Sequence, residues 1–220
     1  MGFVNPSREH ARRFAERAAA RGTDRTFRVL DAGAGSAPYA DLFAHVTYET
    51  ADVCLTEGKD YSHITYRADV VDLPVPDASY DLVWCSQTLE HVRDPDVALA
   101  ELRRVLRPGG EAWLTAPFFY EEHEKPWDFW RFSRYGWAEL AQRADLEVVE
   151  IEPMEGFYGM LAYALLMGGR QLPDELAEGR RAMTRMSKRF AELDLADKRT
   201  DIGMCKNYQV ILRRPVDRAR

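Results

Sequence analysis

Short β-rich runs alternate with segments of helical periodicity along most of the chain. The runs that qualify as strands are 27–32, 46–53, 80–86, 111–118, 146–152 and 207–213. Between them, apolar positions recur at the three- and four-residue spacing of helices that bury one face. Strands that alternate with helices are typical of a parallel sheet covered by helices. The pattern therefore predicts an α/β fold.

The segment 94–110 carries both the start and the stop signals of a helix. Asp94 is placed to cap the N-terminus, and Pro95 suits the first turn. At the other end, arginines complement the helix dipole, and the sequence Pro-Gly-Gly stops the helix. We expect a helix from residue 95 to about residue 107.

Further helices are expected at the start of the chain and before its last strand. Residues 6–22 predict an amphipathic helix, with charges throughout and no apolar centre of the kind a signal peptide has. Residues 157–199 have helical character and separate the last two strands, where a hairpin would need only a few residues. We therefore expect one domain over 1–220, with a helical insertion that covers a site or mediates a homodimer contact.

Composition and charge limit the kinds of partner that the protein is expected to bind. The chain has 46% hydrophobic and 30% charged residues and a formal net charge of -6, so it has no general attraction for nucleic acid. Its three cysteines lie far apart, which predicts no disulfide and no metal site. The longest apolar stretch reaches about half of the roughly 20 residues that a bilayer span requires. We expect a cytoplasmic protein without nucleic-acid or membrane partners.

The stretch FRVLDAGAGSAPYADLF holds the first candidate chemistry. A strand that ends at Asp31 runs into Gly33-Ala34-Gly35, and glycines at the carboxyl edge of a parallel sheet let a ligand lie directly on the backbone. Asp52, near the end of the next strand, is placed to accept hydrogen bonds from the two hydroxyls of a ribose. Glu49 takes that role if the strand ends earlier. The pattern predicts an adenosine-type ligand.

Pro38 argues against a dinucleotide. In the dinucleotide-binding fingerprint a third glycine permits close packing of helix and strand beside a pyrophosphate, whereas this chain has a proline there, expected in the first turn of the next helix. A nicotinamide or flavin dinucleotide is therefore disfavoured. A dinucleotide oxidoreductase is also opposed by the lack of a recognisable Tyr-x-x-x-Lys pair.

Several motifs together resemble one family. VLDAGAG, Asp52, YRADVVDLPVPDASYDLVWCSQTLEHVRDP and ALAELRRVLRPGG are similar to the class I S-adenosylmethionine-dependent methyltransferases, in the branch that acts on small molecules. The resemblance extends from about residue 27 to 151. It implies a Rossmann-like, doubly wound, mostly parallel sheet of seven strands, here with the helical insertion before the last strand. The sequence GAGSAPY departs from the family in lacking a third glycine.

The resemblance also implies the contacts of the cofactor, S-adenosylmethionine. The methionine part would lie against the glycine turn with Asp31 near its ammonium group, and Asp52 would hold the ribose. Asp69 would take the adenine amino group beside Val70, and Ser86 and Gln87, at the end of the strand predicted over 80–86, would flank the sulfonium. The expected cofactor contacts are Asp31, Gly33, Ala34, Gly35, Asp52, Val53, Asp69, Val70, Ser86 and Gln87.

Two histidines are candidate general bases, which methyl transfer requires only when the acceptor carries a proton. His91 follows a strand on the expected ligand side, and its alternative role is to order the loop. His123 lies in the aromatic segment FFYEEHEKPWDFWRFS. Because this setting is hard to explain as ordinary core, we favour His123 over His91.

The same segment supplies candidate substrate contacts. Aromatic residues at this density either plug the edge of the core or line a pocket, and we favour a pocket wall for Tyr120 and Trp127. For Asp128 and Arg131 two interpretations stay open, since they contact the substrate or else pair with each other or cap the following helix. Tyr158, in the helical insertion, is a further candidate wall residue.

The sequence as a whole predicts an enzyme that transfers a methyl group from S-adenosylmethionine to an oxygen or nitrogen of a small metabolite, with oxygen slightly favoured. Carbon methylation stays open. The alternative is a non-catalytic partner or sensor protein that binds the cofactor with the same fold. A nucleic-acid methyltransferase is opposed by the acidic charge balance and by the lack of an Asn-Pro-Pro-Tyr-type element that would grip an extruded base.

Overall fold

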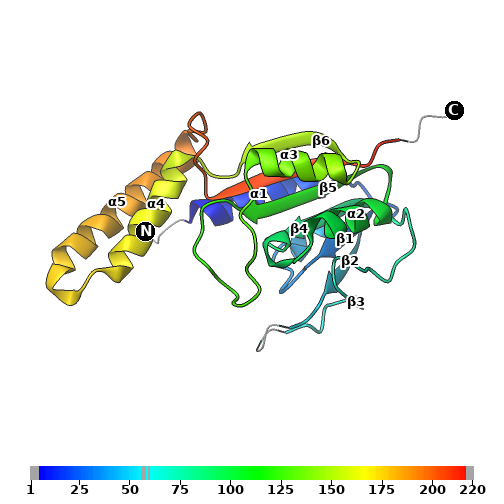
Figure 1. Cartoon of the computed structure of the whole chain (residues 1–220), viewed down its shortest axis with the longest axis horizontal. Coiled ribbons are helices and arrows are strands. Elements are labelled where there is room, and N and C mark those ends of the chain that lie inside the picture. Colours follow the sequence, from blue (N-terminus) through cyan, green and yellow to red (C-terminus); the bar gives the residue numbers. More distant parts are fainter. Residues whose placement is uncertain (1–4, 56–57, 59, 217–220) are drawn as a thin grey trace.

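The computed structural model describes residues 5–55, 58 and 60–216. Within them the chain forms a seven-stranded sheet in the order β3-β2-β1-β4-β5-β7-β6 (Figure 1). All neighbours pair in parallel except β7, which is antiparallel to both β5 and β6. This is the doubly wound, mostly parallel sheet that the sequence predicts. The strands are β1 Arg28–Ala32, β2 Thr47–Asp52, β3 Tyr66–Arg67, β4 Tyr80–Ser86, β5 Leu106–Pro117, β6 Glu147–Pro153 and β7 Asn207–Arg213.

Helices cover both faces of the sheet. Along β4, Leu82 and Trp84 point into one buried cluster, and Val83 and Cys85 point into the other, as the alternation of strand side chains requires. Helix α1 (Pro6–Ala19) covers the first face, where the Phe14 ring lies 5.5 Å from that of Trp84. Helices α2 (Pro95–Val105) and α3 (Arg134–Arg143) cover the second face, which is nearer the viewer in Figure 1.

Element boundaries differ from the predictions in a few places. α2 ends at Val105 rather than near residue 107, because the Arg-Pro-Gly-Gly sequence forms the start of β5. Asp94 occupies the position before α2, but its side chain makes no capping hydrogen bond there. The two-residue strand β3 had no counterpart among the predicted strands, since so short an element leaves no alternation to detect. α1 ends at Ala19 rather than at residue 22.

The helical insertion lies where the sequence predicts it. It consists of α4 (Phe157–Gln171), the short 3₁₀ helix η3 (Asp174–Leu176) and α5 (Ala177–Ala196). α4 and α5 pack against each other and project beyond one end of the sheet (Figure 1). None of the helices in the described ranges combines the length and the apolar character that a membrane crossing requires.

A buried carboxylate joins the insertion to the first helix. Asp194 of α5 is fully buried, and its Oδ1 accepts hydrogen bonds from the backbone N–H groups of Gly156 and Gly159 at 2.9 and 2.8 Å. Its Oδ2 lies 3.1 Å from Nε2 of His10 in α1. The N-terminus of α4 is therefore capped by a side chain from α5. A Cβ at Gly159 would come within 2.8 Å of this carboxylate, so glycine allows the close approach.

We predict that Asp194→Ala lowers the free energy of unfolding by about 2–4 kcal/mol, because two buried N–H groups lose their acceptor. Urea denaturation followed by circular dichroism measures the change. Asp174→Ala is the matched control, since this carboxylate is exposed and forms a surface ion pair with Arg180; its denaturation midpoint should match that of the parent. An unchanged midpoint for Asp194→Ala would show that the carboxylate does not hold the insertion in place.

Candidate functional site

The glycine turn after β1 is tied closely to the neighbouring strands. Gly33 and Ala34 donate backbone hydrogen bonds of 2.8 and 3.1 Å to the carbonyl oxygen of Ala51 in β2. On the other side, the Thr88 hydroxyl donates to the Gly33 carbonyl at 3.3 Å. Gly33 has a φ of 79°, and a Cβ there would lie 2.2 Å from the Thr88 side chain. The position therefore requires glycine for both conformation and space.

Gly35 differs from Gly33 in what surrounds it. It also has a positive φ, 54°, but a Cβ at this position would meet nothing within 4 Å. Its N–H donates a 2.9 Å hydrogen bond to Oδ2 of Asp52. The Gly35 carbonyl oxygen lies 2.9 Å from Nε2 of His63, while the space where a Cβ would lie is open, as a ligand lying close to the turn requires.

The segment after the glycine turn differs from the prediction made for Pro38. Pro38 does not lie in the first turn of a helix, because the chain makes turns at this point and then only a short 3₁₀ helix, η1 (Ala40–Phe43). Ala37 before it has a φ of 46°, a conformation that an α-helix cannot contain. The residue before a proline also avoids the helical region. The proline thus precedes the helical turn.

The two acids proposed for the ribose occupy different places. Asp52 ends β2 beside the glycine turn, where its Oδ1 accepts a 2.6 Å hydrogen bond from the Cys54 N–H. Glu49 lies three positions earlier, and its carboxylate is held within the sheet by Arg28 at 2.6 Å and by the Tyr66 hydroxyl at 2.9 Å. A carboxylate has about four lone-pair sites, so Asp52 keeps capacity for ligand hydroxyls.

Asp31 is a buried acid at the same edge. Only 3% of its surface is exposed, and the Tyr48 hydroxyl donates a hydrogen bond to its Oδ2. Burial raises the pKa of Asp31 to about 7, against the lowering effect of that hydrogen bond, and the nearby charge of Asp52 raises it further. A carboxyl group poised in this way gains stability from a neighbouring cation.

The other expected cofactor contacts lie at the ends of β3 and β4. Asp69 follows β3, where its side chain accepts a 3.2 Å hydrogen bond from the Val71 N–H, and Val70 beside it is buried. Ser86 and Gln87 end β4 and both contact the Thr115 hydroxyl, at 2.8 and 3.1 Å. The structure thus brings the predicted cofactor residues to the carboxyl ends of neighbouring parallel strands. Among them, Val53 follows Asp52 directly and is partly exposed.

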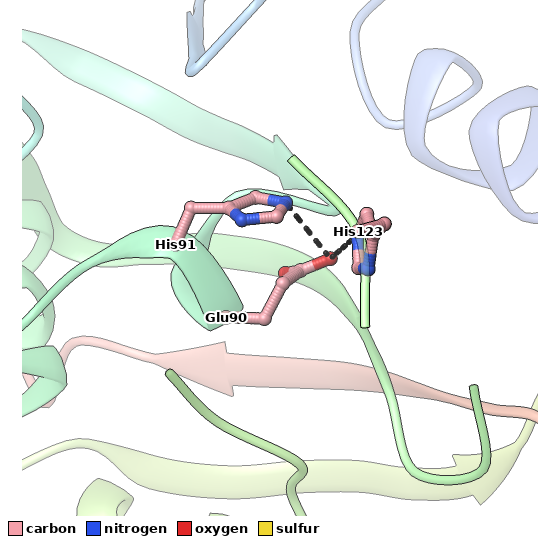
Figure 2. A group of neighbouring side chains, drawn as sticks. All are labelled: Glu90, His91 and His123. Atoms are coloured by element: carbon pink, nitrogen blue, oxygen red, sulfur yellow. Dashed lines mark ion pairs between the residues drawn. The ribbon is translucent and has the colours of Figure 1, made fainter. Parts of the chain in front are cut away.

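The two predicted histidines meet around a residue to which the sequence assigned no role. Glu90, fully buried in the 3₁₀ helix η2 (Leu89–His91), places Oε1 3.9 Å from Nε2 of His91 and 4.0 Å from Nε2 of His123 (Figure 2). Neither of its oxygens has a hydrogen-bond partner among the described residues. Burial raises the pKa of Glu90 to about 8. An acid next to a histidine after a buried strand was the one sequence signal for this cluster.

Asp128 and Arg131 pair with each other. The guanidinium of Arg131 donates hydrogen bonds of 2.7 and 2.8 Å to the two carboxylate oxygens of Asp128, and it also donates to the Glu121 carbonyl at 2.9 Å. The pairing holds the pKa of Asp128 far below its ordinary value. Asp128 Oδ2 also accepts from the His123 N–H at 2.9 Å. These contacts organise the segment that carries His123, and it is Ser133 that caps α3.

A pocket of about 170 Å³ opens beside this segment, between α4 and the first residues of α1. Tyr120 lines it, and its ring stacks on that of Tyr163 at 5.2 Å, while its contact with a substrate stays a prediction. The ammonium group of Lys206 lies 4.5 and 4.6 Å from the two ring centres, and burial lowers its pKa. Arg170 adds a second cation to the lining. Sequence reasoning missed Lys206.

The pocket adjoins the histidine cluster. The Tyr120 ring lies edge-on 5.0 Å from that of His123, which lies 4.7 Å from that of His91. The other two predicted wall residues lie outside the lining. Trp127 is half exposed beneath the guanidinium of Arg93, and Tyr158 stacks on Phe190 of α5 at 5.8 Å. Their contact with a substrate stays a prediction.

Comparison with known proteins finds similarity to methyltransferases over part of the chain. The Methyltransferase domain model matches residues 30–114. A probable S-adenosylmethionine-dependent methyltransferase of Mycolicibacterium smegmatis is 31% identical over 141 residues, which cover 59% of this chain and 54% of that protein. The ubiquinone/menaquinone biosynthesis C-methyltransferase UbiE of Psychromonas ingrahamii is 30% identical over 125 residues, 48% of this chain and 49% of that protein.

Solved structures share the fold. Phosphoethanolamine N-methyltransferase 2 of Haemonchus contortus, determined in complex with S-adenosyl-L-methionine, superposes with a TM-score of 0.58 at 16% identity and covers 97% of this chain and 53% of that one. At this identity the likeness concerns the fold alone. The chain spans about half the length of the curated relatives it matches.

We predict that Gly33→Ala destabilises the protein more than Gly35→Ala. The first substitution combines a left-handed backbone with a clash against Thr88 and should cost about 3 kcal/mol. The second meets open space and should cost about 1–2 kcal/mol for the backbone conformation alone. Urea denaturation of both variants decides the order. Equal losses would contradict the packing of Thr88 on the turn.

Proposed function

We propose that the chain is a class I S-adenosylmethionine-dependent methyltransferase, which transfers a methyl group from S-adenosylmethionine to a small-molecule acceptor. The match of residues 30–114 to the methyltransferase domain model and the 31% identity to a probable S-adenosylmethionine-dependent methyltransferase support this proposal. One observation carries the proposal: the open space beside the Cα of Gly35 lies next to the Asp52 carboxylate at the carboxyl edge of the sheet. An adenosyl ligand needs both a close backbone approach and an acceptor for its ribose hydroxyls.

The residues present fit the cofactor. The glycine turn offers space above Gly35, and Asp52 offers lone pairs to the ribose. The buried Asp31 carboxyl suits the ammonium of the methionine part, while Asp69 lies beyond β3 for the adenine. Ser86 and Gln87, fixed by Thr115, stand at the end of β4, between the turn and the loop after β5.

Bound S-adenosylmethionine supplies a methyl group already activated on a sulfonium. The protein must therefore align the acceptor and exclude water, and such positioning contributes several kcal/mol to lowering a barrier. The pocket lined by Tyr120, Tyr163 and Lys206 is our proposed site for the acceptor, because it adjoins the loops after β4 and β5. A role of His123 or His91 as general base stays a prediction.

The atom that receives the methyl group distinguishes two candidates. The sequence favours oxygen or nitrogen, and the UbiE relatives, which are C-methyltransferases, support carbon as the second candidate. Mass spectrometry of products formed with isotope-labelled methyl donor and a panel of phenolic, amine and quinol acceptors separates them by the position of the label. Contact between two copies through α4 and α5 is likewise a proposal, which sedimentation tests.

We predict that Asp52→Ala weakens binding of S-adenosylhomocysteine by about 5- to 150-fold, because a buried hydrogen-bond partner worth about 1–3 kcal/mol is lost. Calorimetry measures the affinity. Glu49→Gln is the matched control, as this acid is engaged with Arg28 and Tyr66 in the sheet, and its affinity should equal that of the parent. Binding of NAD in preference to S-adenosylhomocysteine, or loss of affinity only in the Glu49 variant, would refute the assignment.

We predict that affinity for S-adenosylhomocysteine rises between pH 5.5 and 7, by up to about tenfold per pH unit. The pKa of Asp31 is raised to about 7, so the acid is largely protonated over this range and must ionise to pair with the ligand's ammonium. The groups that act on its charge are Tyr48 and Asp52. Asp31→Asn should flatten the profile. The same slope in both proteins would contradict the pairing.

A further inference from the structure

The geometry points to a metal site: we propose that Glu90, His91 and His123 bind one divalent transition-metal ion of the Zn²⁺ type through Oε1 and the two Nε2 atoms. The three side chains converge in Figure 2, and one ligand atom from each lies within 4.8 Å of the others. Two imidazoles and a carboxylate suit zinc and its neighbours in the first transition row, and they do not suit Mg²⁺ or Ca²⁺, which prefer oxygen ligands alone.

The distances fit a site that closes on an ion. Oε1 of Glu90 is 3.9 Å from Nε2 of His91 and 4.0 Å from Nε2 of His123. An ion with bonds of about 2.0–2.2 Å in tetrahedral geometry places its ligand atoms about 3.3–3.5 Å apart. Side-chain movements that shift each ligand atom by less than about 1 Å bring the three atoms to these separations.

The outer nitrogens of both imidazoles are already engaged. Nδ1 of His91 lies 2.6 Å from the Trp127 carbonyl, and Nδ1 of His123 lies 3.2 Å from the Glu121 carbonyl and 3.4 Å from Oδ2 of Asp128. A carbonyl oxygen only accepts, so each Nδ1 carries the hydrogen and each Nε2 keeps its lone pair for a metal. Metal-binding histidines almost always have such an outer partner. Here Arg131 fixes the carboxylate that contacts His123.

Glu90 supplies the strongest reason for an ion. Its side chain is 0% exposed and has no hydrogen-bond partner among the described residues, which is costly for a carboxylate. Protonation alone does not remove the cost, because a carboxylic acid also needs an acceptor for its hydrogen. An ion held between Oε1 and two imidazoles satisfies the group. The backbone of Glu90 is fixed, since its carbonyl accepts hydrogen bonds from Phe129 and Trp130.

The position of the site connects two loops at the ligand edge. Glu90 and His91 follow β4, and His123 follows β5, so an ion would join the loop beside the proposed cofactor site to the segment that lines the pocket. Glu124 approaches from the outer side, with Oε2 3.9 Å from Nε2 of His91. Its carboxylate is a candidate fourth ligand on that side. The proposal rests on these contacts and is independent of methyl transfer.

Metal binding is tested directly, without cofactor or acceptor. The full chain is stripped with a chelator, and its affinity for Zn²⁺ and Co²⁺ is measured by competition with a chromophoric chelator, with Mg²⁺ as the comparison ion. We expect one Zn²⁺ per chain and a Co²⁺ absorption spectrum of a four- or five-coordinate site with nitrogen and oxygen ligands. Glu90→Gln and His123→Gln should each weaken Zn²⁺ binding by more than about 100-fold, since losing even an outer partner costs about 10- to 100-fold.

His45→Gln is the matched control. His45 is an exposed histidine before β2, at the opposite end of the sheet, and its Nε2 contacts the carbonyls of Ala19 and Gly22. This variant should keep both stoichiometry and affinity. Circular dichroism confirms that each variant is folded, and His91→Gln replaces Glu90→Gln if the buried substitution unfolds the chain.

Two results would overturn the proposal. Equal Zn²⁺ affinity of the parent and the Glu90 and His123 variants would place the ion elsewhere. Absence of Zn²⁺ binding to the parent would show that the three side chains hold no metal and would leave His123 as a candidate general base. Neither result bears on S-adenosylhomocysteine binding, so the metal site and the proposed methyl transfer fail independently.

Discussion

The contact on which the rest of the site depends is the joining of the β1 turn to the end of β2. Two consecutive N–H groups of the turn donate to the Ala51 carbonyl, and a third, from Gly35, donates to Asp52. Together they fix a left-handed turn where the sheet order reverses direction, with β2 on one side of β1 and β4 on the other. Open α/β sheets bind their ligands at such a point. Because Thr88 fills the space below Gly33, the ligand's side of the turn is defined by packing.

The electrostatics of this edge follow from burial. Asp31 and Glu90 are both acids inside the protein with raised pKa values, and desolvation is the largest cause for each. Elsewhere in the described chain, buried acids have clear partners: Asp194 caps α4, and Glu155 accepts from Asn207. Buried acids whose ionised form is still disfavoured in the folded protein are typical of functional sites. A ligand ammonium beside Asp31 and a metal ion beside Glu90 would each remove that cost.

Much of the fold and of the cofactor edge can be predicted from the sequence, because both depend on local signals. Buried strands give apolar runs, α2 has its proline start, and the glycine turn needs residues that few other structures require. Strand spacing leaves two acids, Asp52 and Glu49, as candidates for the ribose, and the structure shows that Asp52 is the one beside the glycine turn. The missed features are those formed between distant segments. Lys206 and Tyr120 meet because β7 runs antiparallel beside β5, and Glu90 meets His123 because two loops fold together. Neither pairing leaves a periodic pattern in the chain.

The 3₁₀ helix after the turn and the short β3 also escaped prediction, since few residues define them. The pocket is lined in part by α4. The apolar character of this helix predicts that it is buried, but it does not predict which segments pack against it. The most direct test of the account is a crystal structure grown with S-adenosylhomocysteine. We expect the methionine part over residues 33–35, with its ammonium at Asp31 and both ribose hydroxyls on Asp52. A ligand bound elsewhere, or a ribose that leaves Asp52 bonded only to Gly35 and Cys54, would contradict the central claim.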